Sequence, residues 1–415
     1  MRRSGSKNGE NGSSRRPVEA VVLGNLNLVR ALGAARLSVA VMSSHGDDRT
    51  FYSRYCSRRV MVPDLHVSQE AFVRAMETFG RSCEGRPVLF YGDDHSLMLI
   101  SKFRARLESF YRFSMPDAEV VEALVDKVLF TRLARSKDLP IPETLLSDEA
   151  ENIQDILGRL RFPCVLKPAV RRGWFRSGLI GELGGKPQKV IFIQNRSELE
   201  HLYPKMQAYD PHFLVQEAVP GGDDEIYSYH AYFDGDARPL GYFIGRKIRT
   251  YPSGSGVSTY LRLVKEETVR RLGLEIGQKL RLKGVVKMDF KRDARSNRFY
   301  LLEINPRYNL WNYLGAAAGV NLPYLAYEDC MGGDGIGAGA NNAYRTDIRW
   351  LSFKEDVKAF LDSRSDNKMS FWEWILSYRK RKVYNVFAWN DPYPWVVSSA
   401  QYVSLKLRRI RGKVA

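Results

Sequence analysis

The segment LLEINPRYNLWN, residues 301–312, begins as an apolar strand and carries polar side chains at every second position. These side chains are Glu303, Asn305 and Arg307. Because side chains along a strand alternate between its two faces, the three polar groups are predicted to point the same way. A carboxylate, an amide and a guanidinium on one face indicate a binding surface and not a core.

The preceding segment GVVKMDFKRDARSNRFY, residues 284–300, predicts a β-hairpin with this strand. Asp289 would then lie beside Glu303 and Asn305 on the neighbouring strand. Two carboxylates and an amide oxygen are ligands that Mg²⁺ prefers, with water and nucleotide phosphates completing its coordination. The three residues are therefore predicted metal ligands, with Mn²⁺ as an alternative ion and Arg307 placed to hold an anion. The competing interpretation is an exposed strand face with a chance pair of charges.

Two lysines further upstream lie where a phosphate would offset their charge. Lys167 ends the apolar strand CVLKPA, and Lys127 lies near the start of a helix in LVDKVLF. A lysine at the mouth of a sheet is costly unless an anion meets it, although each of these could also extend into solvent. The segment LVQEAVPGGDDE, residues 214–225, predicts a strand that leaves into a hinge. Free backbone groups at such a hinge suit the edge of an adenine, and the acids suit ribose hydroxyls.

The chain has 415 residues, of which 44% are hydrophobic and 27% charged, so it is long enough for two or three globular domains. The four cysteines are scattered singly, which favours a reducing compartment and argues against a structural zinc site. The sequence shows neither an apolar run long enough to span a bilayer nor a cleavable signal pattern. We therefore expect a cytoplasmic protein.

The formal net charge of +17 is concentrated at the two ends of the chain. Residues 1–16 carry five Lys or Arg against one Glu, and residues 379–415 carry nine against one Asp. The body is only mildly basic, so nucleic acid is not an expected partner. The C-terminal region also contains Trp372, Trp374 and Trp395. It predicts either packed helices with a solvated basic face or a peripheral contact with an anionic membrane.

Local patterns divide the chain into parts with different architectures. The segment VEAVVLGNLNLVRALGAARLSVAVMSS, residues 18–44, predicts strand, tight Gly turn, helix and strand, which implies a parallel sheet. Antiparallel hairpins dominate the middle of the chain, so the predicted fold class is α/β plus α+β. The predicted parts are a disordered basic tail (1–16), a Rossmann-like domain (17–119), an α+β domain (120–330), a Gly-rich linker (331–344) and a basic-aromatic helical extension (345–415).

The order of these motifs resembles the ATP-grasp superfamily over about residues 120–315, with a Rossmann-like pre-ATP-grasp region before it. Together with GRKIRTYPSGSGVSTY and NDPYP, the motifs look most like the branch described as predicted carboxylate-amine ligases or carboligases related to biotin carboxylase. The motifs that carry the resemblance are Asp126-Lys127, Lys167-Pro168, Gln216-Glu217-Ala218-Val219-Pro220-Gly221, Asp289 and Glu303-Ile304-Asn305-Pro306-Arg307.

The resemblance implies a two-lobed domain that binds ATP and one or two Mg²⁺ between its lobes. It implies that Lys127 and Lys167 contact phosphates and that Asp289, Glu303 and Asn305 hold the metal. The hinge residues Gln216, Glu217 and Val219 would hold adenine, and Asp224 or Glu225 would hold ribose. One departure from the family pattern is RRGWFRSGLIGELGGKP, residues 171–187, which is bulky and basic where a small-residue loop over the phosphates is expected.

The predicted activity is an ATP- and Mg-dependent ligation of a small carboxylate to an amine through an acyl phosphate. Positioning and charge neutralisation would supply most of the rate. Arg246, Lys247, Arg249 and Arg307 are the predicted holders of the transferred phosphoryl group and the acid. Two alternatives are a kinase of the same fold and a nucleotide-binding module that docks on a membrane through its basic C-terminus.

Overall fold

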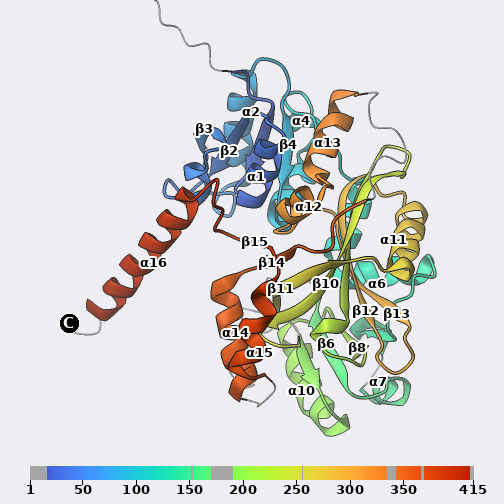
Figure 1. The fold of residues 1–415 in the computed structure, drawn as a ribbon. Coiled ribbons are helices and arrows are strands. Elements are labelled where there is room, and N and C mark those ends of the chain that lie inside the picture. Colours follow the sequence, from blue (N-terminus) through green and yellow to red (C-terminus); the bar gives the residue numbers. More distant parts are fainter. Residues whose placement is uncertain are drawn as a thin grey trace, which may run out of the picture.

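The computed structural model describes residues 16–150, 153–169, 190–254, 256–333, 343–365 and 369–411. Residues 1–15 of the predicted tail, the atypical segment 171–187 and residues 334–342 of the predicted linker lie outside this range. The described residues form three sheets (Figure 1).

The first sheet is parallel, as the opening strand-helix-strand pattern predicts. Its strand order is β3-β2-β1-β4. The turn after β1 needs the positive φ of Gly24, and the Asn25 side chain then caps α1 by accepting from two backbone N–H groups. The elements are β1 (Ala20–Leu23), α1 (Leu26–Ala34), β2 (Val39–Ser43), β3 (Cys56–Met61), α2 (Gln69–Arg81), β4 (Val88–Tyr91), α3 (Asp94–Lys102) and α4 (Arg104–Leu107), followed by α5 (Ala118–Val125) and α6 (Lys127–Ser136).

The second sheet is small and antiparallel, with the strand order β5-β8-β6-β7. Its inner face packs on two helices through a separate apolar cluster that includes Leu166, Met206 and Phe213. The elements are β5 (Thr144–Leu146), α7 (Ile153–Arg159), β6 (Cys164–Pro168), β7 (Ile191–Ile193), α10 (Arg196–Tyr209) and β8 (Phe213–Glu217).

The third sheet is the largest, with the strand order β13-β12-β9-β10-β11-β14-β15. Helix α11 covers one face closely because Gly273 and Gly277 leave room for the rings of Tyr229 and Phe233, where a Cβ atom would lie within 2.6 Å and 2.3 Å of ring atoms. The elements are β9 (Ile226–Phe233), β10 (Pro239–Tyr251), β11 (Val257–Val264), α11 (Glu267–Lys279), β12 (Gly284–Arg292), β13 (Phe299–Asn305), α12 (Asn312–Ala318) and α13 (Leu322–Met331).

The C-terminal part differs from the helical extension that the sequence predicts. Two of its segments are strands that add to the edge of the third sheet, β14 next to β11 and β15 parallel to β14. These strands have only three residues each, too short to show a two-residue periodicity in the sequence. The elements are β14 (Arg349–Leu351), α14 (Phe353–Ser365), α15 (Phe371–Leu376), β15 (Lys382–Tyr384) and α16 (Tyr393–Arg411).

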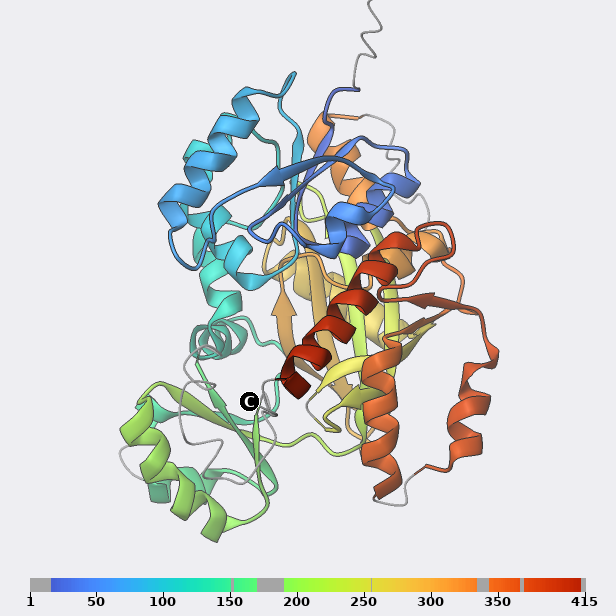
Figure 2. The same ribbon diagram turned by 90° about the vertical axis from the view of Figure 1, so that its left-hand side faces the viewer.

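The three sheets occupy different parts of the molecule (Figures 1 and 2). The parallel sheet lies at one end, the small sheet at the other, and the seven-stranded sheet connects them. Helix α16 projects outward from the body beside the parallel sheet. Among the described residues, no helix combines the length and apolar character needed to cross a membrane.

A buried ion pair anchors the C-terminal segment to the first domain. The Nε atom of Arg30 in α1 donates to Asp391 at 2.9 Å, and both side chains are essentially inaccessible to solvent. Asp391 also accepts from the Ser53 hydroxyl and the Arg54 backbone N–H, at 2.8 Å each. Arg30 Nη2 also donates to the backbone carbonyls of Val386 and Asp391, so Asp391, 361 residues away along the chain, supplies the carboxylate that pairs with the buried guanidinium.

We predict that Asp391→Ala destabilises the protein by about 3–5 kcal/mol, because it leaves the Arg30 charge buried without its partner. Urea unfolding followed by circular dichroism measures the loss. Asp236→Ala is the matched control, since the Asp236 side chain is 74% exposed in its pair with Arg238 and its removal should change little. A loss of less than about 1 kcal/mol in Asp391→Ala would contradict the anchoring role.

Candidate active site

Polar residues from neighbouring strands meet on the face of the third sheet that α11 leaves uncovered. The register places Asp289 of β12 opposite Ser228 of β9 on one side and Glu303 of β13 on the other. Lys287, two residues before Asp289, lies opposite Asn305. The hairpin therefore has the geometry that the alternation of residues predicts, with Asp289, Glu303 and Asn305 on a shared face.

Asp289 is 4% exposed and is surrounded by positive charge. It accepts a short hydrogen bond from the Ser228 hydroxyl and one of 2.6 Å from the Lys287 ammonium. Burial alone would raise its pKa, but Lys287, Lys247 and these hydrogen bonds together lower the pKa below its usual range. Asp289 is thus a carboxylate that stays ionised in a buried place.

A chain of polar contacts leads from this carboxylate cluster to the first domain. The Asn305 amide donates to Glu303 at 3.1 Å, and the Arg307 guanidinium donates to Asn305 Oδ1 at 3.3 Å. The Nε atom of Arg307 also donates to the Asp94 carboxylate at the start of α3. Arg307 therefore lies between the predicted metal ligands and the end of the parallel sheet.

The donor set fits a magnesium ion that shares a nucleotide. Among the described residues no three His, Cys, Asp or Glu side chains gather as a complete metal site. Asp289 and Glu303, directly opposite each other, supply two carboxylates, and Asn305 supplies an amide oxygen. Mg²⁺ commonly keeps few protein ligands and takes the remaining oxygens from phosphates and water, which matches this incomplete set.

Lys167 at the end of β6 places a positive charge on the small antiparallel sheet, which is called the small lobe below. Its ammonium donates to Gln216 Oε1 at 2.7 Å, and Gln216 in turn donates to the Thr144 hydroxyl at 2.8 Å. Burial and the nearby Lys127 lower the pKa of Lys167 to about 8, although Glu303 of the large sheet opposes the shift. The two predicted phosphate-binding lysines are thus close enough to repel each other, and Lys167 interacts with a predicted metal ligand across the two lobes.

Lys127 and the hinge have local roles visible in the structure. The Lys127 backbone N–H donates to the Ala169 carbonyl at 3.0 Å, which fixes the start of α6 against the end of β6. The Glu217 carboxylate accepts from the Arg161 backbone N–H at 2.9 Å. The peptide groups of Glu217 and Ala218 donate to Glu143 and Pro163, so Val219 is the next hinge position whose backbone could meet an adenine.

The two predicted ribose-binding acids are held by arginines. Arg246 donates to the Asp224 carboxylate at 3.1 Å and lies 3.6 Å from Glu225. Arg292 binds Glu225 through two hydrogen bonds of 2.7 Å and 3.1 Å. Of the two, Asp224 has the more exposed side chain, at 58%, and is the more accessible to a ligand.

The basic residues of β10, Arg246, Lys247 and Arg249, do not lie on one face of the sheet. A bulge at Ile248 leaves Lys247 opposite Leu261 and Arg249 opposite Tyr260, so Arg249 shares the face of Arg246 and not that of Lys247. Lys247 is buried on the site face, where burial lowers its pKa while Asp289 opposes the shift. Arg246 stacks over Tyr227 on the other face.

The placement of Arg249 in the phosphate site is therefore corrected. Arg249 is buried against α14 and binds both carboxylate oxygens of Asp356, at 3.0 Å and 2.8 Å. Asp356 also accepts from the Thr259 hydroxyl at 2.7 Å and the Trp374 indole at 2.9 Å. This cluster ties α14 and α15 to the sheet, and Arg249 has a structural role in it.

Several residues near the site were missed in the sequence. Lys287 could have been found, since it shares the strand face of Asp289 two residues away. Asp94 could not, because it meets Arg307 only in the folded chain, 213 residues apart. His230, fully buried, stacks on Phe243 at 4.6 Å and contacts Asn309 through Nδ1 at 3.1 Å.

No family model matches the chain. Its sequence is similar to the D-aspartate ligase of Enterococcus faecium, with 24% identity over 238 residues that cover 56% of this chain and 55% of that protein. The chain spans about half the length of the curated relatives it matches.

The fold is similar to that of two solved enzymes. One is biotin carboxylase from Campylobacter jejuni, with a TM-score of 0.58 and 14% identity over 80% of this chain and 74% of that chain. The other is L-amino acid ligase from Bacillus licheniformis, with a TM-score of 0.54 and 15% identity over 80% of this chain and 77% of that chain. The chain therefore has the ATP-grasp fold, as the order of its motifs predicts.

Proposed function

We propose that this protein is an ATP- and Mg-dependent ligase that activates a carboxylate as an acyl phosphate for attack by an amine. The observation that carries the proposal is the pair Asp289 and Glu303, opposite each other on the β12–β13 hairpin. Similar proteins are named as a D-aspartate ligase and an L-amino acid ligase, which supports ligation.

In this proposal the side chains divide the charge of the triphosphate between the lobes. Lys127 and Lys167 bind phosphate oxygens from the small lobe, and the hinge at Glu217 and Val219 holds adenine. Asp224 is the proposed ribose ligand, since its side chain is 58% exposed, whereas Glu225 is 13% exposed and is held by Arg292. Asp289, Glu303 and Asn305 would hold Mg²⁺, which offsets the charge of the transferring phosphoryl group. Mn²⁺ is an alternative ion at this site.

Lys247 and Arg307 are the proposed anion holders at the reacting carboxylate. Both lie beside the predicted metal ligands, and Arg307 offers a planar fork that fits a carboxylate or phosphate. Arg246 lies on the opposite face, so its proposed role is to position Asp224. An alternative is a kinase of this fold, which would form a phosphorylated product from one substrate, whereas a ligase releases phosphate only when both substrates are present.

A second candidate function is peripheral binding to an anionic membrane through α16 and the residues before it. Helix α16 begins against the loop near Asp47, with the Gln401 amide donating to the Asp47 carbonyl at 2.6 Å, and then projects from the body (Figures 1 and 2). Its exposed apolar residues Val396, Ala400, Val403 and Leu407 follow helical spacing.

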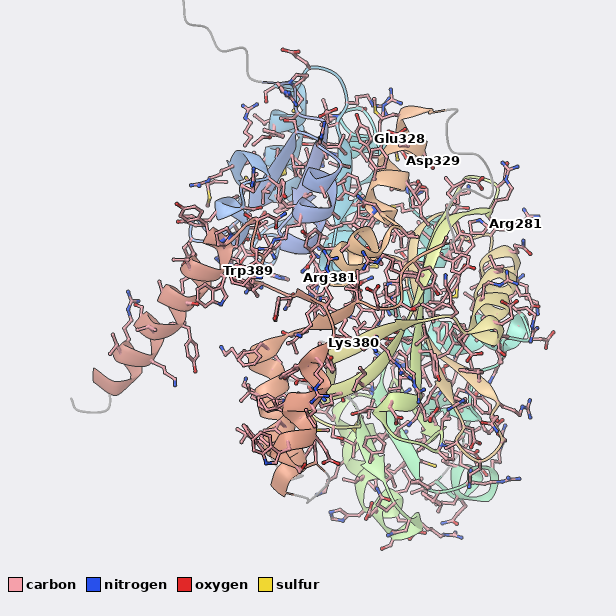
Figure 3. All side chains as sticks on the ribbon, in the orientation of Figure 1. Arg281, Glu328, Asp329, Lys380, Arg381 and Trp389 are labelled. Carbon is pink, nitrogen blue, oxygen red and sulfur yellow. The ribbon has the colours of Figure 1, made fainter. Side chains whose placement is uncertain are left out.

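Aromatic and basic side chains extend this surface. Trp389 at the base of α16 is 88% exposed, and Lys380 and Arg381 lie between that base and α15 (Figure 3). No acidic residue occurs within 393–411, whereas Lys406 and Arg408 are exposed there. Exposed tryptophan beside basic residues suits the anionic interface of a bilayer. We therefore propose that α16 and the residues before it bind an anionic membrane.

The metal assignment predicts that Asp289→Asn combined with Glu303→Gln reduces MgATP-dependent ligation by at least about a hundredfold, because the two carboxylates would no longer offset the metal charge. Product formation from ATP, acid and amine measures this. Asp236→Asn is the control, and circular dichroism checks folding. Ligation at the wild-type rate in a folded double variant would refute the metal assignment.

The lowered pKa of Lys167 predicts proton uptake when ATP binds. At pH 8 the free amine is about half protonated, and a bound triphosphate would complete its protonation, so about half a proton is taken up. At pH 6.5 the amine is already charged and its uptake vanishes. Calorimetry in two buffers of different ionisation enthalpy measures the uptake. Lys167→Arg, which stays charged, should lack it, and equal uptake in both proteins would contradict the assignment.

The membrane surface predicts that Lys406→Glu with Arg408→Glu reduces binding to vesicles of phosphatidylserine and phosphatidylcholine by at least about thirtyfold, since each of the two basic residues contributes about 1 kcal/mol near such a surface. Co-sedimentation measures the bound fraction. The control is Arg271→Glu with Lys279→Glu on α11, on the other side of the molecule (Figure 1). Equal pelleting of wild type and the α16 variant would exclude this surface.

A further inference from the structure

The carboxyl end of the parallel sheet meets the candidate active site. The strand order β3-β2-β1-β4 places β1 and β4 side by side, although the connections from β1 lead in sequence to β2 and β3. Open α/β sheets bind ligands at such a change of direction, outside the carboxyl ends of the strands. In this chain the residues directly after β4 are Gly92, Asp93 and Asp94.

The segment after β13 is fixed to this end of the sheet. The Tyr308 backbone N–H donates to the Tyr91 carbonyl at 3.3 Å. The Tyr308 ring, 3% exposed, packs against the rings of Phe90 and Tyr91 at centroid distances of 5.3 Å and 6.0 Å. Arg307, the preceding residue, is thereby held within reach of Asp94.

The two neighbouring acids after β4 have different tasks. Asp93 is used locally as the N-cap of α3, where it accepts from the Ser96 backbone N–H at 2.9 Å and from the Ser96 hydroxyl at 2.7 Å. Asp94 makes no such cap bond. Its side chain is 49% exposed and is directed to the Arg307 guanidinium.

We infer that Asp94 and Arg307 form the subsite for an amino acid, in which Arg307 binds its carboxylate and Asp94 its ammonium group. The contacts of Arg307 determine how the bound amino acid is oriented. Arg307 contacts Asn305, which contacts Glu303, so the guanidinium lies on the side of the predicted metal ligands and Asp94 on the far side. The carboxylate of the bound amino acid is therefore the group presented for activation, and its ammonium is held away from the phosphates.

Charge balance favours a zwitterion in this place. Asp94 and Arg307 neutralise each other in the structure, and an amino acid can insert between them and leave both charges paired. A hydroxy acid of the same shape would satisfy Arg307 but would leave Asp94 without a cation. Loss of one hydrogen bond to a charged group costs about 1.5–3 kcal/mol, which corresponds to about 10- to 150-fold in affinity.

This inference rests on the proposed function, because the subsite lies beside the proposed nucleotide site. The test below distinguishes failure of the subsite from failure of the proposed function. Full-length protein saturated with Mg²⁺ and ADP is screened by thermal shift against the twenty standard amino acids and their D-enantiomers. Calorimetry then compares each hit with the hydroxy acid of the same carbon skeleton, such as lactate for alanine or malate for aspartate. We expect the amino acid to bind wild type at least about tenfold more tightly than the hydroxy acid.

The variant Asp94→Asn should lose this preference and still bind MgADP with unchanged affinity. Asp117→Asn, an exposed acid before α5, is the matched control and should keep the preference. Two results would overturn the subsite: wild type binds MgADP but no amino acid, or the preference survives in Asp94→Asn. Failure of wild type to bind MgADP at all would instead overturn the proposed function together with the subsite that rests on it.

Discussion

The pairing of Asp289 with Glu303 across β12 and β13 is the constraint on which the candidate site depends. It brings a buried carboxylate, Asp289, beside an exposed one, Glu303 on the edge strand β13, where like charges repel and burial raises the cost of ionising Asp289. The structure offsets this cost with cations from adjacent positions, Lys287 at 2.6 Å from Asp289 and the buried Lys247 on β10. Asp289, kept ionised by the surrounding lysines, suits a site whose ligands are themselves a metal ion and a polyanion.

The same arrangement explains why the site lies between separate sheets. Lys167 and Gln216 belong to the small sheet, the carboxylates to the large one, and Asp94 to the end of the parallel sheet. The small sheet has its own apolar cluster, whereas one face of the parallel sheet shares a core with the large sheet, so the side chains of the small sheet are held separately from those of the other two. The buried contacts of Asp391 with Arg30 and of Asp356 with Arg249 tie the C-terminal segments to two of these sheets.

Local patterns in the sequence were sufficient to predict the polar face of the β12–β13 hairpin and the parallel sheet. Alternation along β13 placed Glu303 and Asn305 together, and the Gly turn after β1 marked the first strand-helix unit. Alternation along β10 should likewise have separated Lys247 from Arg246, but the bulge at Ile248 that also turns Arg249 away has no clear local signal. The strands β14 and β15 and the contact of Asp94 with Arg307 depend on tertiary packing, so the sequence alone could not reveal them.

The central claim is that a divalent cation joins a nucleoside triphosphate to the carboxylates of the β12–β13 hairpin. The most direct measurement is calorimetric titration of ATP into the wild-type protein, once with Mg²⁺ and once with EDTA. We predict saturable binding to one site that is at least about tenfold tighter with Mg²⁺, which is about 1.4 kcal/mol. Equal affinity under the two conditions, or no binding of ATP in either, would contradict the account.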